Sequence, residues 1–124
     1  MTTKDITEQE FESLISKPGT VLVDFWAAWC GPCRQFAPIY EAASTKYPEI
    51  TFAKVDTEAE KELSAAAGIS SIPTLMIFRD GILLFSQPGA LPASALDEVI
   101  SKVQELDMVD VRKQIADQSK DLKN

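Results

Sequence analysis

The segment that most constrains the fold is residues 20–26, with the sequence TVLVDFW. It is almost continuously apolar and rich in β-branched and aromatic residues, which is typical of a strand buried on both faces. Such a strand lies inside a sheet with parallel neighbours and needs helices on both sides. The segment therefore predicts an α/β fold, and Asp24 is its one charged residue.

The rest of the pattern predicts further strands and helices around this one. Strands are expected at 3–6, 50–56 and in a hairpin at 74–86 that turns at Asp80-Gly81; helices are expected at 7–17, 32–47, 57–67 and 90–106. Thr57 is expected to cap the third helix, because threonine side chains accept backbone N–H groups at helix starts. Parallel crossovers followed by a hairpin predict a central mixed β-sheet flanked by helices on both faces.

The C-terminal residues are expected to form a separate amphipathic helix. Its apolar face is rotated by about a quarter turn from that of the preceding helix, so a break is expected near residues 107–110. That face consists of Met108, Val111, Ile115 and Leu122. We divide the chain into a domain at 1–107 and an extension at 108–124. The extension is interpreted as solvated or docked on the domain, with dimerisation or partner binding as the alternative.

The charge of the chain limits its partners. Its 124 residues carry 12 lysines and arginines against 19 acidic residues, a net charge of −7. This acidity argues against nucleic acid or an anionic membrane as the main partner. No apolar run approaches the roughly 20 residues of a membrane span. The first residues lack the basic and apolar segments of a secretory signal, which predicts a cytoplasmic location.

The only two cysteines, Cys30 and Cys33, are separated by two residues, and the chain has no histidine. A zinc site usually needs four cysteine or histidine ligands, of which this chain supplies two. A structural disulfide stabilises by closing a long loop, and two intervening residues close almost none. A redox-active pair is therefore favoured over both alternatives, and no metal is expected.

The position of the pair suggests how it reacts. A strand leads into a turn, and Cys30 stands at or just before the first residue of the next helix. The free N–H groups and positive dipole end there favour thiolate over thiol. We interpret Cys30, at the exposed start, as the nucleophile and the shielded Cys33 as the resolving thiol.

Together, VDFWAAWCGPCRQFAP and SIPTL resemble the thioredoxin family over about residues 3–106. The resemblance implies a thioredoxin fold and protein-disulfide reductase activity without a bound cofactor or metal. It implies disulfide-bearing protein substrates and recharging by an NADPH-dependent thioredoxin reductase, and a monomer is expected. A net oxidant or isomerase is an alternative, and so is a binding module or co-chaperone whose thiols are incidental.

Asp24 has a structural and a functional interpretation. A buried carboxylate is costly, so it could be an acid partnered by Lys54 on the neighbouring strand. It could instead have a raised pKa and exchange a proton with Cys33. The resemblance implies the second role for Asp24, with Lys54 as its companion.

The resemblance also implies a substrate-binding surface around the cysteines. The Ile72–Pro73 bond is expected to be cis, so that the Ile72 backbone can pair with an incoming peptide. Trp26 is expected to pack in the core, and Trp29 to border the thiol. The expected apolar patch comprises Trp29, Gly31, Pro32, Ile72, Pro73, Gly89 and Ala90. Gly89 could instead be a turn residue. Ser70-Ser71 replaces larger residues that are common in the family at this point.

Overall fold

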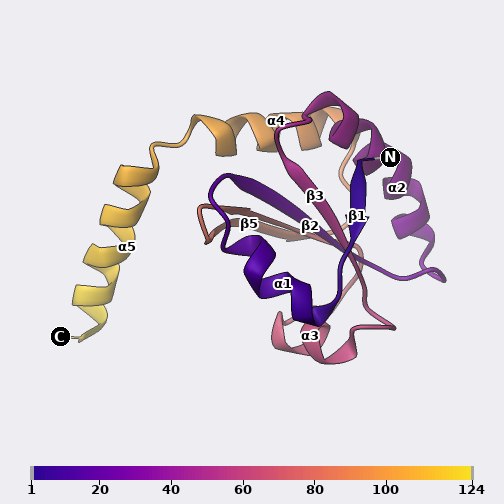
Figure 1. Ribbon diagram of the computed structural model, residues 1–124, viewed down its shortest axis with the longest axis horizontal. Helices are drawn as coiled ribbons and strands as arrows, with labels where there is room; N and C mark the ends of the chain where they lie inside the picture. Colours follow the sequence, from indigo (N-terminus) through magenta and orange to yellow (C-terminus); the bar gives the residue numbers. More distant parts are fainter. Residues whose placement is uncertain (1, 124) are drawn as a thin grey trace.

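One five-stranded sheet forms the centre of the molecule (Figure 1). The structure, a computed structural model, describes the backbone of residues 2–123 and the side chains of residues 2–119. The strands are β1 (Thr3–Asp5), β2 (Thr20–Trp26), β3 (Thr51–Asp56), β4 (Thr74–Arg79) and β5 (Ile82–Pro88). Their order is β1-β3-β2-β4-β5, with β1, β3 and β2 parallel and β4 and β5 antiparallel. The predicted central position of β2 in a mixed sheet is confirmed. The prediction that its neighbours are parallel is wrong on one side, because β4 belongs to the hairpin and pairs with β2 antiparallel.

Four helices cover the two faces of this sheet (Figure 1). They are α1 (Glu8–Ile15), α2 (Gly31–Lys46), α3 (Lys61–Ala66) and α4 (Ala93–Glu105). Alternate side chains of β2 point to opposite faces: Val23 packs with α1 and α3, and Leu22 packs with α2 and α4. The same alternation places Asp24 on the α2 side. Within residues 2–123, no helix is long and apolar enough to cross a bilayer.

The predicted start of α3 is wrong. Residues 57–59 form a turn, and the helix begins only at Lys61. The Thr57 hydroxyl does not cap the helix, because it donates to the Trp26 carbonyl at the end of β2, 3.1 Å away. The Asp56 carboxylate accepts the N–H groups of Glu58 and Ala59 instead, at 2.9 and 3.4 Å. These contacts attach the turn to the ends of β2 and β3.

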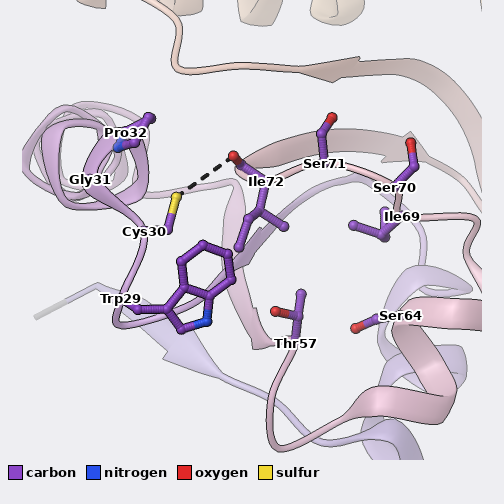
Figure 2. A pocket seen from close by; sticks show the side chains of 10 residues that line it. All are labelled: Trp29, Cys30, Gly31, Pro32, Thr57, Ser64, Ile69, Ser70, Ser71 and Ile72. Carbon is purple, nitrogen blue, oxygen red and sulfur yellow. Dashed lines mark hydrogen bonds between the residues drawn. The ribbon is translucent and has the colours of Figure 1, made fainter.

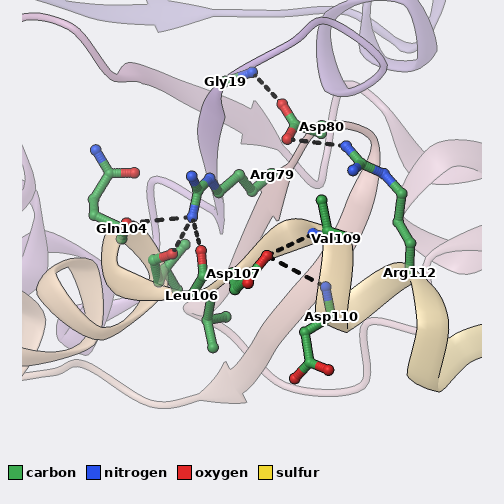
Figure 3. Close-up of polar contacts among 10 residues, drawn as sticks. Gly19, Arg79, Asp80, Gln104, Leu106, Asp107, Val109, Asp110 and Arg112 are labelled. Atoms are coloured by element: carbon green, nitrogen blue, oxygen red, sulfur yellow. Dashed lines mark hydrogen bonds and ion pairs between the residues drawn. The ribbon is translucent and has the colours of Figure 1, made fainter.

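A hydrogen-bonded hinge joins α4 to α5 (Met108–Lys123), at the break that the sequence predicts (Figure 3). The Arg79 guanidinium donates to three carbonyls at the end of α4, those of Val103, Gln104 and Leu106, at 2.9, 3.3 and 2.8 Å. The Asp107 carboxylate accepts the first N–H groups of α5, with Val109 N at 3.0 Å. The hinge therefore satisfies several of the backbone groups that the two helix ends leave unpaired.

The beginning of α5 is docked, and residues 113–119 are exposed. Met108 is buried, and Arg112 pairs with Asp80 at 3.4 Å. Further along, α5 points away from the sheet (Figure 1), and Ile115 is 43% exposed. The extension thus combines the docked and solvated forms that the sequence predicts. The expected apolar position Leu122 lies outside the described side chains.

Candidate active site

Cys30 is the N-cap residue of α2, and its sulfur lies over the open end of the helix. The backbone N–H of Cys33 donates to Cys30 Sγ at 3.2 Å. The two cysteines are joined as a disulfide, with their Cα atoms 5.2 Å apart. Because an N–H donor and the positive helix end face this sulfur, a thiolate on Cys30 is stabilised when the disulfide is open.

The sequence predicts an exposed Cys30 and a shielded Cys33, but both cysteines are buried in the structure. Cys30 is 4% exposed and Cys33 3% exposed. The reason is that Trp26 and Ile72 pack against the pair, which forms a small apolar cluster with Ala27. The two cysteines have nearly equal exposure but different access, since Cys30 lines an open cleft and Cys33 does not.

This cleft, which we call the Cys30 cleft, has a volume of about 440 Å³ (Figure 2). Figure 2 shows Trp29 and Ile72 next to the sulfur, and Thr57 and Ser64 lying further from it across the opening. Its lining residues are Trp29, Cys30, Gly31, Pro32, Thr57, Ser64, Ile69, Ser70, Ser71 and Ile72. The Trp29 side chain is 67% exposed, so its ring is a free wall of the cleft. Four of the seven predicted patch residues, Trp29, Gly31, Pro32 and Ile72, line it.

The loop before β4 lies against the disulfide. The Ile72–Pro73 peptide bond is cis, as the family resemblance implies. The Ile72 carbonyl oxygen lies 3.6 Å from Cys30 Sγ. Pro73, Gly89 and Ala90 lie outside the cleft lining, but the Gly89 N–H donates to the Pro73 carbonyl at 2.7 Å. Gly89 has a φ of +103°, a conformation that favours glycine, and it ties the end of β5 to this loop.

Asp24 lies behind the disulfide in β2, opposite Lys54 in the parallel register of β3. It is 1% exposed, and its Oδ1 atom has no hydrogen-bond partner among the described residues. Burial raises the pKa of Asp24 to about 7, while the positive charge of Lys54 acts in the opposite direction. No ion pair between the two side chains occurs within the described part of the chain.

A second, smaller cavity of about 90 Å³ connects Lys54 with Cys33. It is also lined by Trp26, and the Lys54 ammonium lies 4.9 Å from the centre of the Trp26 ring. Trp26 is partly buried against the cysteine cluster, which confirms its predicted packing role. Cys33 therefore shares this cavity with Lys54, while Cys30 lines the cleft.

Sequence reasoning missed the α3 side of the cleft. Thr57 was expected to cap a helix, and Ser64 and Ile69 were not singled out. Glu58 was missed as well, although its carboxylate accepts the Trp29 indole N–H at 2.8 Å. One signal was present in the sequence. These residues follow β3, and because β3 runs parallel to β2, the carboxyl ends of both strands lie at the same end of the sheet.

Relatives of known family match most of the chain. The family model described as thioredoxin matches residues 2–102. A Streptomyces coelicolor protein named as a thioredoxin 2 is 53% identical over 116 residues, covering 94% of this chain and 87% of that protein. Thioredoxin of Listeria monocytogenes is 43% identical over 100 residues, covering 80% of this chain and 96% of its own. The first match extends into α5, because 94% coverage leaves only about eight residues of this chain unmatched.

Solved structures show the same fold. Plasmodium falciparum thioredoxin superposes with a TM-score of 0.74 and 39% identity, covering 80% of this chain and 97% of its own. Fasciola hepatica thioredoxin gives a TM-score of 0.74 and 36% identity with the same coverage. In this family the general partners are disulfide-bearing proteins and thioredoxin reductase. The chain carrying Cys30 and Cys33 at the start of α2 belongs to the thioredoxin family and is a thiol-disulfide oxidoreductase.

Proposed function

We propose that the chain is a general, monomeric protein-disulfide reductase of the cytoplasm, recharged by an NADPH-dependent thioredoxin reductase. The observation that carries the proposal is the N–H donor that Cys33 directs at Cys30 Sγ, 3.2 Å away at the start of α2. It supports a reactive thiolate on the one cysteine that lines the cleft. In this proposal residues 1–107 perform the reaction, and 108–124 are an extension.

In the first step the Cys30 thiolate attacks one sulfur of a substrate disulfide. A bond forms between Cys30 Sγ and that sulfur, and the substrate's own S–S bond breaks. The second substrate sulfur leaves with the electron pair and takes a proton from solvent. The stabilisation of the thiolate at the helix start favours this attack at neutral pH.

In the second step Cys33 attacks Cys30 Sγ and forms the Cys30–Cys33 bond, and the bond between Cys30 and the substrate sulfur breaks. That sulfur leaves with the electron pair and takes a proton from solvent, so the substrate is released as a second thiol. The Cys33 thiol must first lose its proton, and Asp24 is the proposed acceptor, because a carboxyl with a pKa of about 7 exchanges protons readily near neutral pH. Lys54 is its proposed companion, since its charge favours the ionised carboxylate. The two cysteines together supply the two electrons that reduce the substrate, and they end as a disulfide.

The substrate is proposed to bind as an extended peptide against the Ile72 backbone, in the manner of an added strand. Trp29, Gly31, Pro32 and Ile72 contact it from the cleft lining. Pro73, Gly89 and Ala90 are the proposed continuation of this surface beyond the cleft, which the hydrogen bond from Gly89 to Pro73 supports.

The test is reduction of insulin disulfides in the presence of NADPH and a thioredoxin reductase, with the rate measured as the oxidation of NADPH. We expect sustained turnover that Cys30→Ser abolishes. A binding module would show no thiol-dependent turnover, while both forms would still capture a partner. A net oxidant would have a redox potential between about −180 and −120 mV, which would also contradict the proposal.

A further inference from the structure

The lining of the Cys30 cleft is uncharged, but two charged side chains lie beside it: the Arg34 guanidinium next to Gly31, and a carboxylate bonded to the Trp29 wall. The indole N–H of Trp29 donates to Oε1 of Glu58 at 2.8 Å. Figure 2 shows the indole nitrogen on the side of the ring toward Thr57, the residue before Glu58. The Glu58 carboxylate therefore lies beside the cleft, next to the ring that forms its exposed wall.

The position of Glu58 is fixed by the turn that carries it. Thr57 donates its N–H and its hydroxyl to the Trp26 carbonyl, at 2.9 and 3.1 Å. The Glu58 N–H donates to Asp56 Oδ1 at 2.9 Å. Thr57 is bonded to the end of β2, and the Glu58 N–H is bonded to the end of β3. These hydrogen bonds hold the backbone of Glu58 beside the cleft.

The surroundings of Glu58 are strongly acidic. Residues 56–62 contain four acids and one base, while residues 69–72, which form the opposite wall, contain no charge. Two of the other acids are occupied: Asp56 binds the turn, and Glu60 Oε1 accepts the Glu8 N–H at 2.8 Å. Oε2 of Glu58 has no hydrogen bond or ion pair with any residue that the structure describes.

We propose that Glu58 sets the substrate preference of this cleft, holding Trp29 through one carboxylate oxygen and attracting a basic side chain beside the substrate cysteine through the other. The preferred substrate is then a protein disulfide with lysine or arginine within two residues of the attacked cysteine. This inference rests on the proposed function, because it assumes that substrates bind in the Cys30 cleft. A local negative field attracts such segments and repels acidic ones.

The test uses three disulfide-bonded peptides that are identical except for lysine, glutamine or glutamate next to the cysteine. The protein is reduced chemically beforehand, and kcat/KM is measured for each peptide at low and high salt without any reductase. We expect the lysine peptide to react about tenfold faster than the glutamate peptide, roughly threefold from attraction and threefold from repulsion. The ratio should shrink at high salt.

Matched variants separate charge from position. Glu58→Gln keeps an acceptor for the indole N–H and loses the charge, so the lysine-to-glutamate ratio should fall toward one. Glu58→Asp keeps the charge and should restore most of the ratio. Glu49→Gln makes the same change in net charge in the loop between α2 and β3, at the opposite end of the sheet, and should leave the ratio unchanged.

Two results would overturn the inference: an unchanged ratio in Glu58→Gln, or an equal fall in Glu49→Gln. A merely structural role of Glu58 would slow all three peptides together and leave their ratio unaltered. Failure of the proposed function looks different, because no peptide would then be reduced in a Cys30-dependent way.

Discussion

The two ends of the sheet treat their buried polar groups in opposite ways. At the cysteine end, Oδ1 of Asp24 and Nε1 of Trp26 are buried and have no hydrogen-bond partner among the described residues. At the hinge end, Arg79 donates to three carbonyls, and Asp80 accepts both the Gly19 N–H and the Arg112 guanidinium. Hydrogen bonds to polar groups are therefore concentrated at the hinge, where the chain changes direction. Beside the cysteines, where the chemistry takes place, two buried polar atoms lack such bonds.

This contrast distinguishes a structural region from a reactive one. An unpaired buried polar group lowers stability, so a fold retains one only where another requirement outweighs the loss. In the proposed mechanism the Asp24 carboxyl gains and loses a proton, so strong partners that fix one protonation state would oppose that role. The guanidinium of Arg79 has no such task, and its contacts serve only to hold α4 and α5.

The largest effect is expected from Asp24→Asn, which removes the costly group at the cysteine end. The folded-state pKa is about 7 against an ordinary 3.8, so the folded protein holds this proton while the unfolded chain loses it. Stability from this group is therefore complete below pH 4, declines as the pH rises to 7, and is lost above it. The variant should be more stable than the parent by about 4 kcal/mol at pH 8.

Urea unfolding of the oxidised forms at pH 4 and pH 8 checks this expectation. The gain should nearly vanish at pH 4, and an equal gain at both pH values would assign it to packing instead. The same variant should reduce insulin more slowly. Rates equal to those of the parent across pH 6–9 would remove Asp24 from the mechanism.

A smaller effect of opposite sign is expected from Arg79→Ala at the hinge end. The change leaves three carbonyls without their charged donor, and hydrogen bonds to charged groups contribute about 1.5–3 kcal/mol. We expect a loss of about 2 kcal/mol in the free energy of unfolding and unchanged insulin reduction. Arg79→Lys is the matched control, because it keeps the charge but not the planar donor. A loss of activity in folded Arg79→Ala would show that the two ends are coupled.

The smallest effect is expected from Arg112→Ala, which removes the pair with Asp80. Both side chains are partly exposed, and such surface pairs contribute about 0–1 kcal/mol. Global stability should change by less than about 0.5 kcal/mol, while amide hydrogen exchange in α5 should become faster. Lys113→Ala serves as the control, because Lys113 is the next residue in α5 and its ammonium group makes no ion pair with the described residues of the hairpin. Equal exchange in both variants would mean that Met108 alone docks the helix.

The sequence predicted the features that depend on local pattern. The buried run of β2, the Asp80-Gly81 hairpin and the break before α5 are all present. The start of α3 was predicted wrongly, because the Thr57 hydroxyl bonds a carbonyl 31 residues away in the chain. No local rule contains such a contact.

The site divides in the same way. Cys30 and Cys33 could be identified from their spacing and from the helix that follows them. The low exposure of Cys30 could not, since it depends on Ile72, which reaches the cysteines only through the fold. Glu58 was missed for the same reason. It follows β3, its partner Trp29 follows β2, and only the pairing of the two strands brings these residues together.

The direction of α5 has a practical use. Figure 1 shows this helix leaving the molecule on the side away from the start of α2. A resin, a dye or a reporter attached to the exposed residues 113–119 would therefore leave the mouth beside Cys30 open to large folded clients. Immobilised protein could then be used to trap mixed-disulfide adducts from whole extracts.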